Sequence, residues 1–576
     1  MFDIAVIFDE AIIVMTPSTS TPSEAPRIEE LLAQIATLEA EKRQISAQRD
    51  AFRDAFERAR IELLLIRRRI FLASAERVDT TQLELEFKEK LNALEVMAGT
   101  LGMPVPPDGN EPERTKRKPT GRRNLRDQGL EEQRLELTDP VFDALVAQGK
   151  AKLIKFDESS RLAWQRGGMR VLILARAVYQ TVDGDGESVV ATTEMPPEAF
   201  ARCMAAPSLI AHIAVAKHCD GLPLARQEEI LSRDGVPLDR GTMCRYLEDL
   251  GGTVGATVVE AMQLDAKRTA FCVATDATGV RIQPEREAGK RNPCDRGHFF
   301  IQIADRDHVL FTYTRYETSA AVAEMFKGYK GYVQADAKNV FDVLFLPDAK
   351  AAVDHERRSE VGCWSHARRR FWEAAVAKFE VGREGLRRIG RIFELDATWR
   401  GRPPNDIKRL RQLHLRLHVD AFFEWAADEL KKVEAVRGLV RDALGYATRQ
   451  REPLSAFLAD GRLEMTNNRS ERGLRNIAVG RKNWLFCGSD DHAEAAANIM
   501  TTIASAKLHR LDPELYLRDL IRVLPHWPKD RYLELAPKYW KATRALLNAQ
   551  QLVNEYGPLD VPEPEDPATE QKTGPN

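Results

Sequence analysis

Three acidic residues occupy positions that could hold metal ions beside a polyanion. Asp276 ends a β-branched and aromatic run at 271–276, and Asp336 closes a second such run at 331–336, so the sequence predicts both at the tips of buried strands. Glu471 lies in a segment of helical spacing, 468–479, among arginine and lysine. Three such carboxylates can hold two Mg²⁺ ions about 4 Å apart, one beside the nucleophile and one beside the leaving oxygen. Taken singly, an Asp at a strand end is usually a turn residue, and a lone Glu among arginines is more often an ion-pair partner on a solvated helix.

The elements between the acids form a recognisable order. Residues 297–314 are predicted to be two strands joined by a turn near 305–307, and residues 319–329 a helix capped by Thr318 or Ser319. This order is the layout of a ribonuclease-H-like catalytic core: a strand with an acid, a hairpin, a helix, a second strand with an acid and a later helix with an acid. The expected fold is therefore multidomain α/β with a helical N-terminus, in which a mixed five-stranded sheet with flanking helices is interrupted by an all-helical insertion.

Several longer motifs resemble one family. The sequence is similar to the DDE transposases of the insertion sequence 66 family over roughly residues 200–540, and the block Asn-Asn-x-x-Glu-Arg…Gly-Arg-Lys-Asn-Trp-Leu-Phe is the most specific part. The resemblance implies DNA strand cleavage and strand transfer, with a catalytic and metal-binding triad of Asp276, Asp336 and Glu471. It also implies Mg²⁺ as cofactor, for which Mn²⁺ can substitute. The matching stretches are 222–230, 275–278, 334–336, 362–371, 467–489 and 506–518.

Basic and amide side chains around the acids are candidates for DNA contact. Trp484 could stack on an extruded base or equally be a core residue. One departure from the family is Thr466, which stands where an Asp normally precedes the Asn-Asn pair; we expect it to alter local packing and not metal binding. A catalytically inactive DNA-binding regulator of the same fold is the alternative function. The expected DNA-contacting residues are Arg368, Arg369, Asn467, Asn468, Arg472, Arg475, Arg481, Lys482 and Trp484.

Composition fits a large soluble enzyme, and the family resemblance implies a bacterial protein of the cytoplasm, associated with the nucleoid. The chain has 576 residues, is 43% hydrophobic and 30% charged, and has a formal net charge of -2, so its basic residues matter through local clustering. No apolar run approaches the roughly 18 residues of a membrane span, and the first residues lack a basic leader. Seven scattered cysteines predict reduced thiols.

The N-terminal part predicts self-association. Residues 1–26 are expected to be disordered, and 27–100 to form a coiled coil because heptad seam positions from Ile28 to Ile70 are almost all apolar. A homo-oligomer would suit strand transfer at two element ends. Residues 101–129 form a basic flexible linker that could also bind phosphates. The expected partners are double-stranded DNA, as terminal inverted repeats and target, together with accessory proteins of the same element.

Residues 130–200 are predicted to be a small β module that replaces the zinc ribbon of related transposases. No cysteine precedes Cys203, so no structural zinc is expected, and 153–156, 161–164 and 169–178 read as short strands. The pair Cys363 and His366 has half-site spacing without a second pair, and we expect it to brace the floor of the catalytic site.

The remaining segments are helical or belong to the core. Residues 201–255 are consistent with a helix-turn-helix or with a helical hairpin that braces the core. We place the first part of the core at 265–365, the helical insertion at 366–460 and the end of the core with the Glu471 helix at 461–510. C-terminal helices at 511–556 and a disordered tail at 557–576 complete the chain.

Overall fold

The computed structural model describes residues 37–38, 40–42, 130–165, 168–182, 188–201, 203–284, 293–345, 358–433 and 438–563. The chain divides into two units, 1–110 with 375–387 and 111–374 with 388–576. The segments expected as a disordered N-terminus (1–26) and a basic linker (101–129) lie outside the described residues. So does the expected coiled coil (27–100), except for five helical residues between 37 and 42. The tail expected at 557–576 is described only to residue 563.

A four-stranded sheet begins the described part of the second unit. Strand β3 (Gly168–Val182) lies at its centre and pairs with β1 (Glu131–Leu137), β2 (Ala151–Gln165) and β4 (Ser188–Thr192). The helix α3 (Pro140–Ala147) connects β1 to β2. The prediction of two short strands at 153–156 and 161–164 is wrong, because antiparallel pairing with β3 continues through the polar residues between them. All seven cysteines lie outside this sheet and are free thiols.

Four helices lead from this sheet toward the second one. They are α4 (Pro207–His218), α5 (Leu224–Arg233), α6 (Arg240–Val254) and α7 (Glu260–Thr269), with a π-helical turn (Gly255–Val259) before α7. Asp239 caps α6 by accepting the Thr242 N–H at 3.0 Å. A Cβ at Gly251 would collide with Ala495, so α6 packs closely along α17 (Asp490–Leu508). One face of α6 therefore braces the core, whereas Arg245 is exposed.

The second sheet has five strands in the order β7-β6-β5-β8-β9. Strands β5 (Cys272–Ile282), β6 (Asp295–Ala304) and β7 (His308–Thr314) pair antiparallel, and β8 (Tyr332–Gln334) and β9 (Ser359–Val361) continue the sheet in parallel with β5. The helix α8 (Ser319–Met325) connects β7 to β8. The chain is thus a mixed α/β protein, as the sequence predicted.

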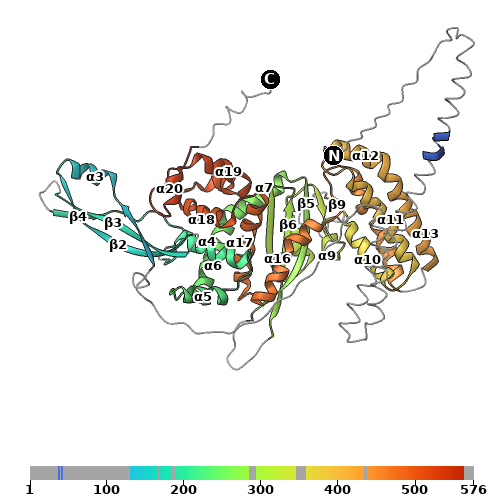
Figure 1. Cartoon of the computed structure of the whole chain (residues 1–576), viewed down its shortest axis with the longest axis horizontal. Helices are drawn as coiled ribbons and strands as arrows, with labels where there is room; N and C mark the ends of the chain where they lie inside the picture. Colours follow the sequence, from blue (N-terminus) through green and yellow to red (C-terminus); the bar gives the residue numbers. More distant parts are fainter. Residues whose placement is uncertain are drawn as a thin grey trace, which may run out of the picture. The chain divides into compact units, whose positions relative to one another are not determined.

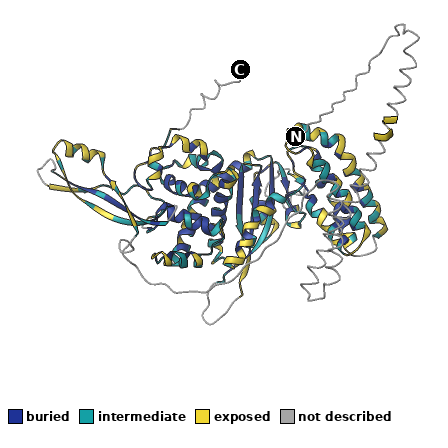
Figure 2. Cartoon of the chain, viewed as in Figure 1, coloured by how far each residue is buried: buried dark blue, intermediate teal, exposed yellow. Residues whose placement is uncertain are grey.

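Both faces of this sheet are buried by helices (Figures 1 and 2). Because successive strand residues point to opposite faces, Phe299 and Ile301 pack with Leu474 and Ile477 of α16 (Asn468–Trp484), whereas Phe300 faces the larger core on the other side. A Cβ at Gly473 would collide with Ile301, so glycine permits α16 to lie close against β6.

All regular elements that the structure describes between 364 and 458 are helices. Trp364 is fully buried there, in tilted and edge-on ring contacts with Phe422, Phe423 and Phe457, and its Nε1–H donates to the Leu454 carbonyl at 2.8 Å. These helices therefore have their own aromatic core. They are α10 (Trp364–Val376), α11 (Glu380–Ala397), α12 (Pro404–Leu410), a π-helical turn (Arg411–Leu415), α13 (Arg416–Val433), α14 (Leu439–Arg449), α15 (Arg451–Ser455) and a 3₁₀ turn (Ala456–Leu458).

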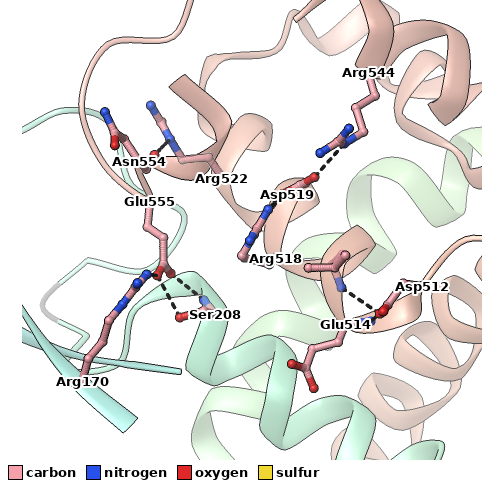
Figure 3. A network of polar contacts seen from close by, with 11 residues as sticks. Arg170, Ser208, Asp512, Glu514, Arg518, Asp519, Arg522, Arg544, Asn554 and Glu555 are labelled. Carbon is pink, nitrogen blue, oxygen red and sulfur yellow. Dashed lines mark hydrogen bonds and ion pairs between the residues drawn. The ribbon is translucent and has the colours of Figure 1, made fainter. Parts of the chain in front are cut away.

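The C-terminal segment returns to the first sheet. The helices α18 (Pro513–Val523), α19 (Pro537–Leu546) and α20 (Ala549–Val553) precede Glu555, which is buried and accepts hydrogen bonds from Arg170 and from both the N–H and the hydroxyl of Ser208 (Figure 3). Arg522 donates to the Asn554 carbonyl and holds the same segment from α18. No described helix is long and apolar enough to cross a membrane.

Candidate active site

Asp276 lies within β5 and not at its tip. The strand continues six residues further, and Asp276 pairs with Ile301 of β6, so the prediction that the strand ends at the acid is wrong. The pairing along the other edge of β5 explains better where Asp276 lies. Strand β8 pairs with β5 only from Cys272 to Ala274, so its pairing stops two residues before Asp276. Asp336 follows the end of β8 by two residues, which brings both acids to the point where β5 and β8 diverge.

The electrostatics of Asp276 reflect this placement. Burial raises the pKa of its carboxyl group, and the negative charge of Asp336 raises it further. The hydrogen bond from the Ala277 N–H, at 2.7 Å, and the charge of Lys338, whose Nζ lies 4.0 Å from Oδ1, act in the opposite direction. Lys338 is also 3.4 Å from Glu317. Two like charges in a partly buried site favour a cation nearby.

Asn467 fixes the start of α16 against β5. Its side-chain amide donates to the Thr275 carbonyl at 2.6 Å, and its backbone N–H donates to the Cys363 sulfur at 3.2 Å. Both bonds are buried. Because Thr275 directly precedes Asp276, this side chain ties the first turn of the helix, which contains Glu471, to the strand that contains the first acid.

His366 brings two of the acids together. Its Nε2 lies 3.5 Å from Asp336 Oδ2 and 3.8 Å from Glu471 Oε1, so oxygens from positions 135 residues apart approach the same ring nitrogen. Burial lowers the pKa of His366, but Cys363 and the two carboxylates outweigh it and raise the pKa to about 9. The imidazole is therefore cationic at neutral pH. The sequence predicted that Cys363 and His366 brace the floor of the site, but it did not predict the contact of His366 with the two carboxylates. The signal that could have pointed to this contact is the position of both residues within the matching stretch 362–371.

The donor set suits a hard divalent cation. Among the described residues, no three His, Cys, Asp or Glu side chains are already arranged as metal ligands. The acids are instead neighboured by two protein cations, His366 and Lys338. Asp276, Asp336 and Glu471 would present only carboxylate oxygens, the ligands that Mg²⁺ prefers, and a bound cation would relieve the repulsion between Asp276 and Asp336.

An exposed basic face extends along α16 from Glu471. Arg472, Arg475 and Lys482 are exposed and have no hydrogen bond or ion pair with any residue that the structure describes. On α10, Arg368 and Arg369 are exposed as well, and Arg369 lies one turn after His366, paired with Glu373 at 3.4 Å.

The other expected DNA contacts have structural partners. Asn467 is fully buried, so its amide serves the α16 attachment and is not presented to DNA, which corrects that expectation. Asn468 accepts a hydrogen bond from Ser365, at 3.0 Å. Arg481 donates to the Thr278 hydroxyl and the Gly279 carbonyl. Trp484 is half-buried against the core under α16.

Carboxylates gathered beside exposed guanidinium groups are typical of enzymes that act on nucleic-acid backbones. Comparison with known proteins gives the family. The transposase IS66 family matches residues 202–495, and the IS66 C-terminal element matches residues 501–537. The chain belongs to the IS66 transposase family, and this membership implies a transposase-type enzyme that binds DNA.

Its curated relatives include proteins of Sinorhizobium fredii (strain NBRC 101917 / NGR234). The uncharacterized protein y4qI is 28% identical over 415 residues, which cover 70% of this chain and 75% of the relative. The uncharacterized protein y4hP is 26% identical over 382 residues, covering 62% of this chain and 66% of the relative.

Proposed function

We propose that this protein cleaves DNA at the ends of an insertion sequence and transfers the freed strands to target DNA. The supporting observation is that Asp336 and Glu471 both approach Nε2 of His366, and that the charge of Asp336 raises the pKa of Asp276. In this proposal Asp276, Asp336 and Glu471 are the metal ligands and form the DDE triad.

Two bound Mg²⁺ ions, or Mn²⁺ in their place, would activate the attacking oxygen and stabilise the leaving oxygen. The protein's own residues position the DNA and the acids. Asn467 holds Glu471 beside β5 through its bond to Thr275, and His366 neutralises part of the carboxylate charge. Arg475 and Lys482 meet the phosphate backbone from the exposed face of α16, and Arg368 and Arg369 approach it from α10.

The core is proposed to be ribonuclease-H-like. Support comes from the order of elements: β5 with the first acid, the β6–β7 hairpin, α8, β8 with the second acid, and later α16 with the third. The helices from α10 to α15 would then be an insertion between the second and third acids. Self-association through residues 27–100 also belongs to this proposal.

A cleavage assay tests the proposal directly. Duplex DNA carrying the native element ends is incubated with the protein and Mg²⁺, and nicked and joined products are counted. Glu471→Gln keeps the shape of the side chain but removes the charge of a metal ligand, so it should abolish cleavage and strand transfer while DNA affinity remains within about threefold of wild type. Cleavage by Glu471→Gln at close to the wild-type rate would refute the assigned role.

The alternative is a DNA-binding regulator of the same fold that does not cleave. The observation in its favour is that no described group of acids is preassembled as a metal site. Wild-type protein that binds the ends but cuts nothing with either Mg²⁺ or Mn²⁺ would establish this alternative.

A further inference from the structure

The turn after α16 exposes two large apolar side chains. Leu485 is 60% exposed and Phe486 is 40% exposed, although the preceding Trp484 packs against the core. Isolated exposed apolar residues are common. This pair is unusual because the backbone around it is both strained and firmly held.

Leu485 has φ 65° and ψ -45°, a conformation that residues with a side chain rarely adopt. The Phe486 N–H donates to the Trp484 carbonyl at 2.8 Å, which makes a γ-turn centred on Leu485. On the helix side, the Leu485 N–H donates to the Arg481 carbonyl at 3.1 Å. The turn therefore closes α16 with a leucine in a position where glycine would relieve strain.

The end of β5 holds the turn on its other side. The Cys487 N–H donates to the Arg281 carbonyl, and the Gln283 N–H donates to the Cys487 carbonyl, each at 2.8 Å. Cys487 thus pairs with the strand that contains Asp276. Because both ends of the turn are attached, Leu485 and Phe486 remain at the surface in a fixed place. Residues in strained conformations concentrate at sites where the surrounding structure holds them for a function.

The exposed face of α16 connects this turn to the acids. Glu471, Arg475, Val479 and Lys482 recur at helical spacing and are all exposed. Arg475 and Lys482 have no partner among the described residues. An acid and two unpaired cations therefore follow one another along one exposed face of α16, and the helix ends at the apolar turn. This combination complements a polyanion with an apolar interior.

We propose that Leu485 and Phe486 form a wedge that inserts between base steps of duplex DNA lying along this face of α16. The inference rests on the proposed function. Apolar side chains inserted in this way unstack a base step and bend the duplex. At about 1.5 Å per helical residue the wedge lies roughly 21 Å from Glu471, which corresponds to about six base steps of about 3.4 Å each. Two apolar side chains flanked by cations are too small an area for a second protein chain.

The test measures unstacking with 2-aminopurine placed at successive positions of an end-containing duplex. Wild-type protein should raise the fluorescence at one step, about four to eight base steps from the cleaved bond. The double variant Leu485→Gly, Phe486→Ser should reduce that rise at least about fivefold. Glycine suits the φ of Leu485, so the variant is expected to fold, and circular dichroism verifies this. Leu546→Ala is the matched control, because it removes an exposed apolar residue of α19, which the proposal does not place against DNA, and it should leave the signal unchanged.

A second measurement uses a duplex that carries a mismatch at the unstacked step. If the wedge supplies the unstacking, the double variant should cleave this substrate at close to the wild-type rate. An unchanged fluorescence rise in the double variant, or wild-type cleavage without any rise, would overturn the wedge while leaving the proposed function intact. A shift of oligomeric state in the double variant without loss of unstacking would assign the turn to a second copy and also refute the wedge. Absence of cleavage with a normal fluorescence rise would instead contradict the transposase proposal alone.

Discussion

Replacing Asn467 with alanine should both destabilise the protein and slow cleavage. The change removes the 2.6 Å bond to the Thr275 carbonyl, which is worth about 1 kcal/mol, and deprives that buried oxygen of this donor at a cost of about 1–3 kcal/mol. The Asn467 Oδ1 is buried without a partner among the described residues, so its removal returns about 1 kcal/mol. The expected net loss is therefore about 1–3 kcal/mol. Because the first turn of α16 loses its attachment to β5, cleavage should fall at least about tenfold.

The assay compares Asn467→Ala with Asn483→Ala. Asn483 lies on the same helix and also donates to a backbone carbonyl, that of Gly221 at 3.0 Å, but the bond is exposed. Its loss should cost less than about 0.5 kcal/mol. Urea unfolding followed by tryptophan fluorescence gives the stability of each variant, and hydrogen exchange of the first turn of α16 locates the change. Equal stability of the two variants, or cleavage by Asn467→Ala at the wild-type rate, would refute the view that Asn467 positions the site.

Three further predictions concern binding, pH and the C-terminal segment. Arg475→Ala and Lys482→Ala should each weaken binding to all duplexes alike and reduce the slope of log affinity against log salt by about one, whereas an unchanged slope would exclude a phosphate contact. Burial, with a smaller contribution from Asp342, raises the pKa of the Glu360 carboxyl group to about 7. Between about pH 4.5 and about pH 7 the folded state therefore holds a proton on Glu360 that the unfolded state has lost. The free energy of unfolding should fall by about 1–2 kcal/mol as the pH rises through this range. Glu360→Gln should flatten this dependence in denaturation curves, and a parallel pH profile would count against the shift. Glu555→Ala should lower the midpoint of thermal unfolding more than Glu555→Gln, because only glutamine retains an oxygen for the buried donors around it; equal midpoints would contradict this reasoning.

Much of the local structure could be predicted from the sequence. The cap of α6 can be predicted from Asp239, and the helical spacing of Leu474 and Ile477 predicts the buried face of α16, because capping and periodicity depend on residues close together in the chain. The extent of strands was less predictable. Strand β2 is continuous because it pairs with β3, and β5 continues beyond Asp276 because it pairs with β6. Backbone hydrogen bonds to a partner strand can continue through polar residues that, in the sequence, resemble the end of a strand.

The sequence by itself determined the family, the mixed α/β class and which acids are candidates for chemistry, since these follow from residue types and their spacing. Only the tertiary structure brought Asp336 and Glu471 to the same nitrogen of His366, buried Asn467 and left Leu485 exposed in a strained turn. The physical reason is that each of these properties depends on contacts between segments that are far apart in the chain or on the backbone conformation those contacts impose. Spacing along the sequence specifies neither: Cys363 and His366 look like half of a zinc site until the fold brings two carboxylates to the imidazole.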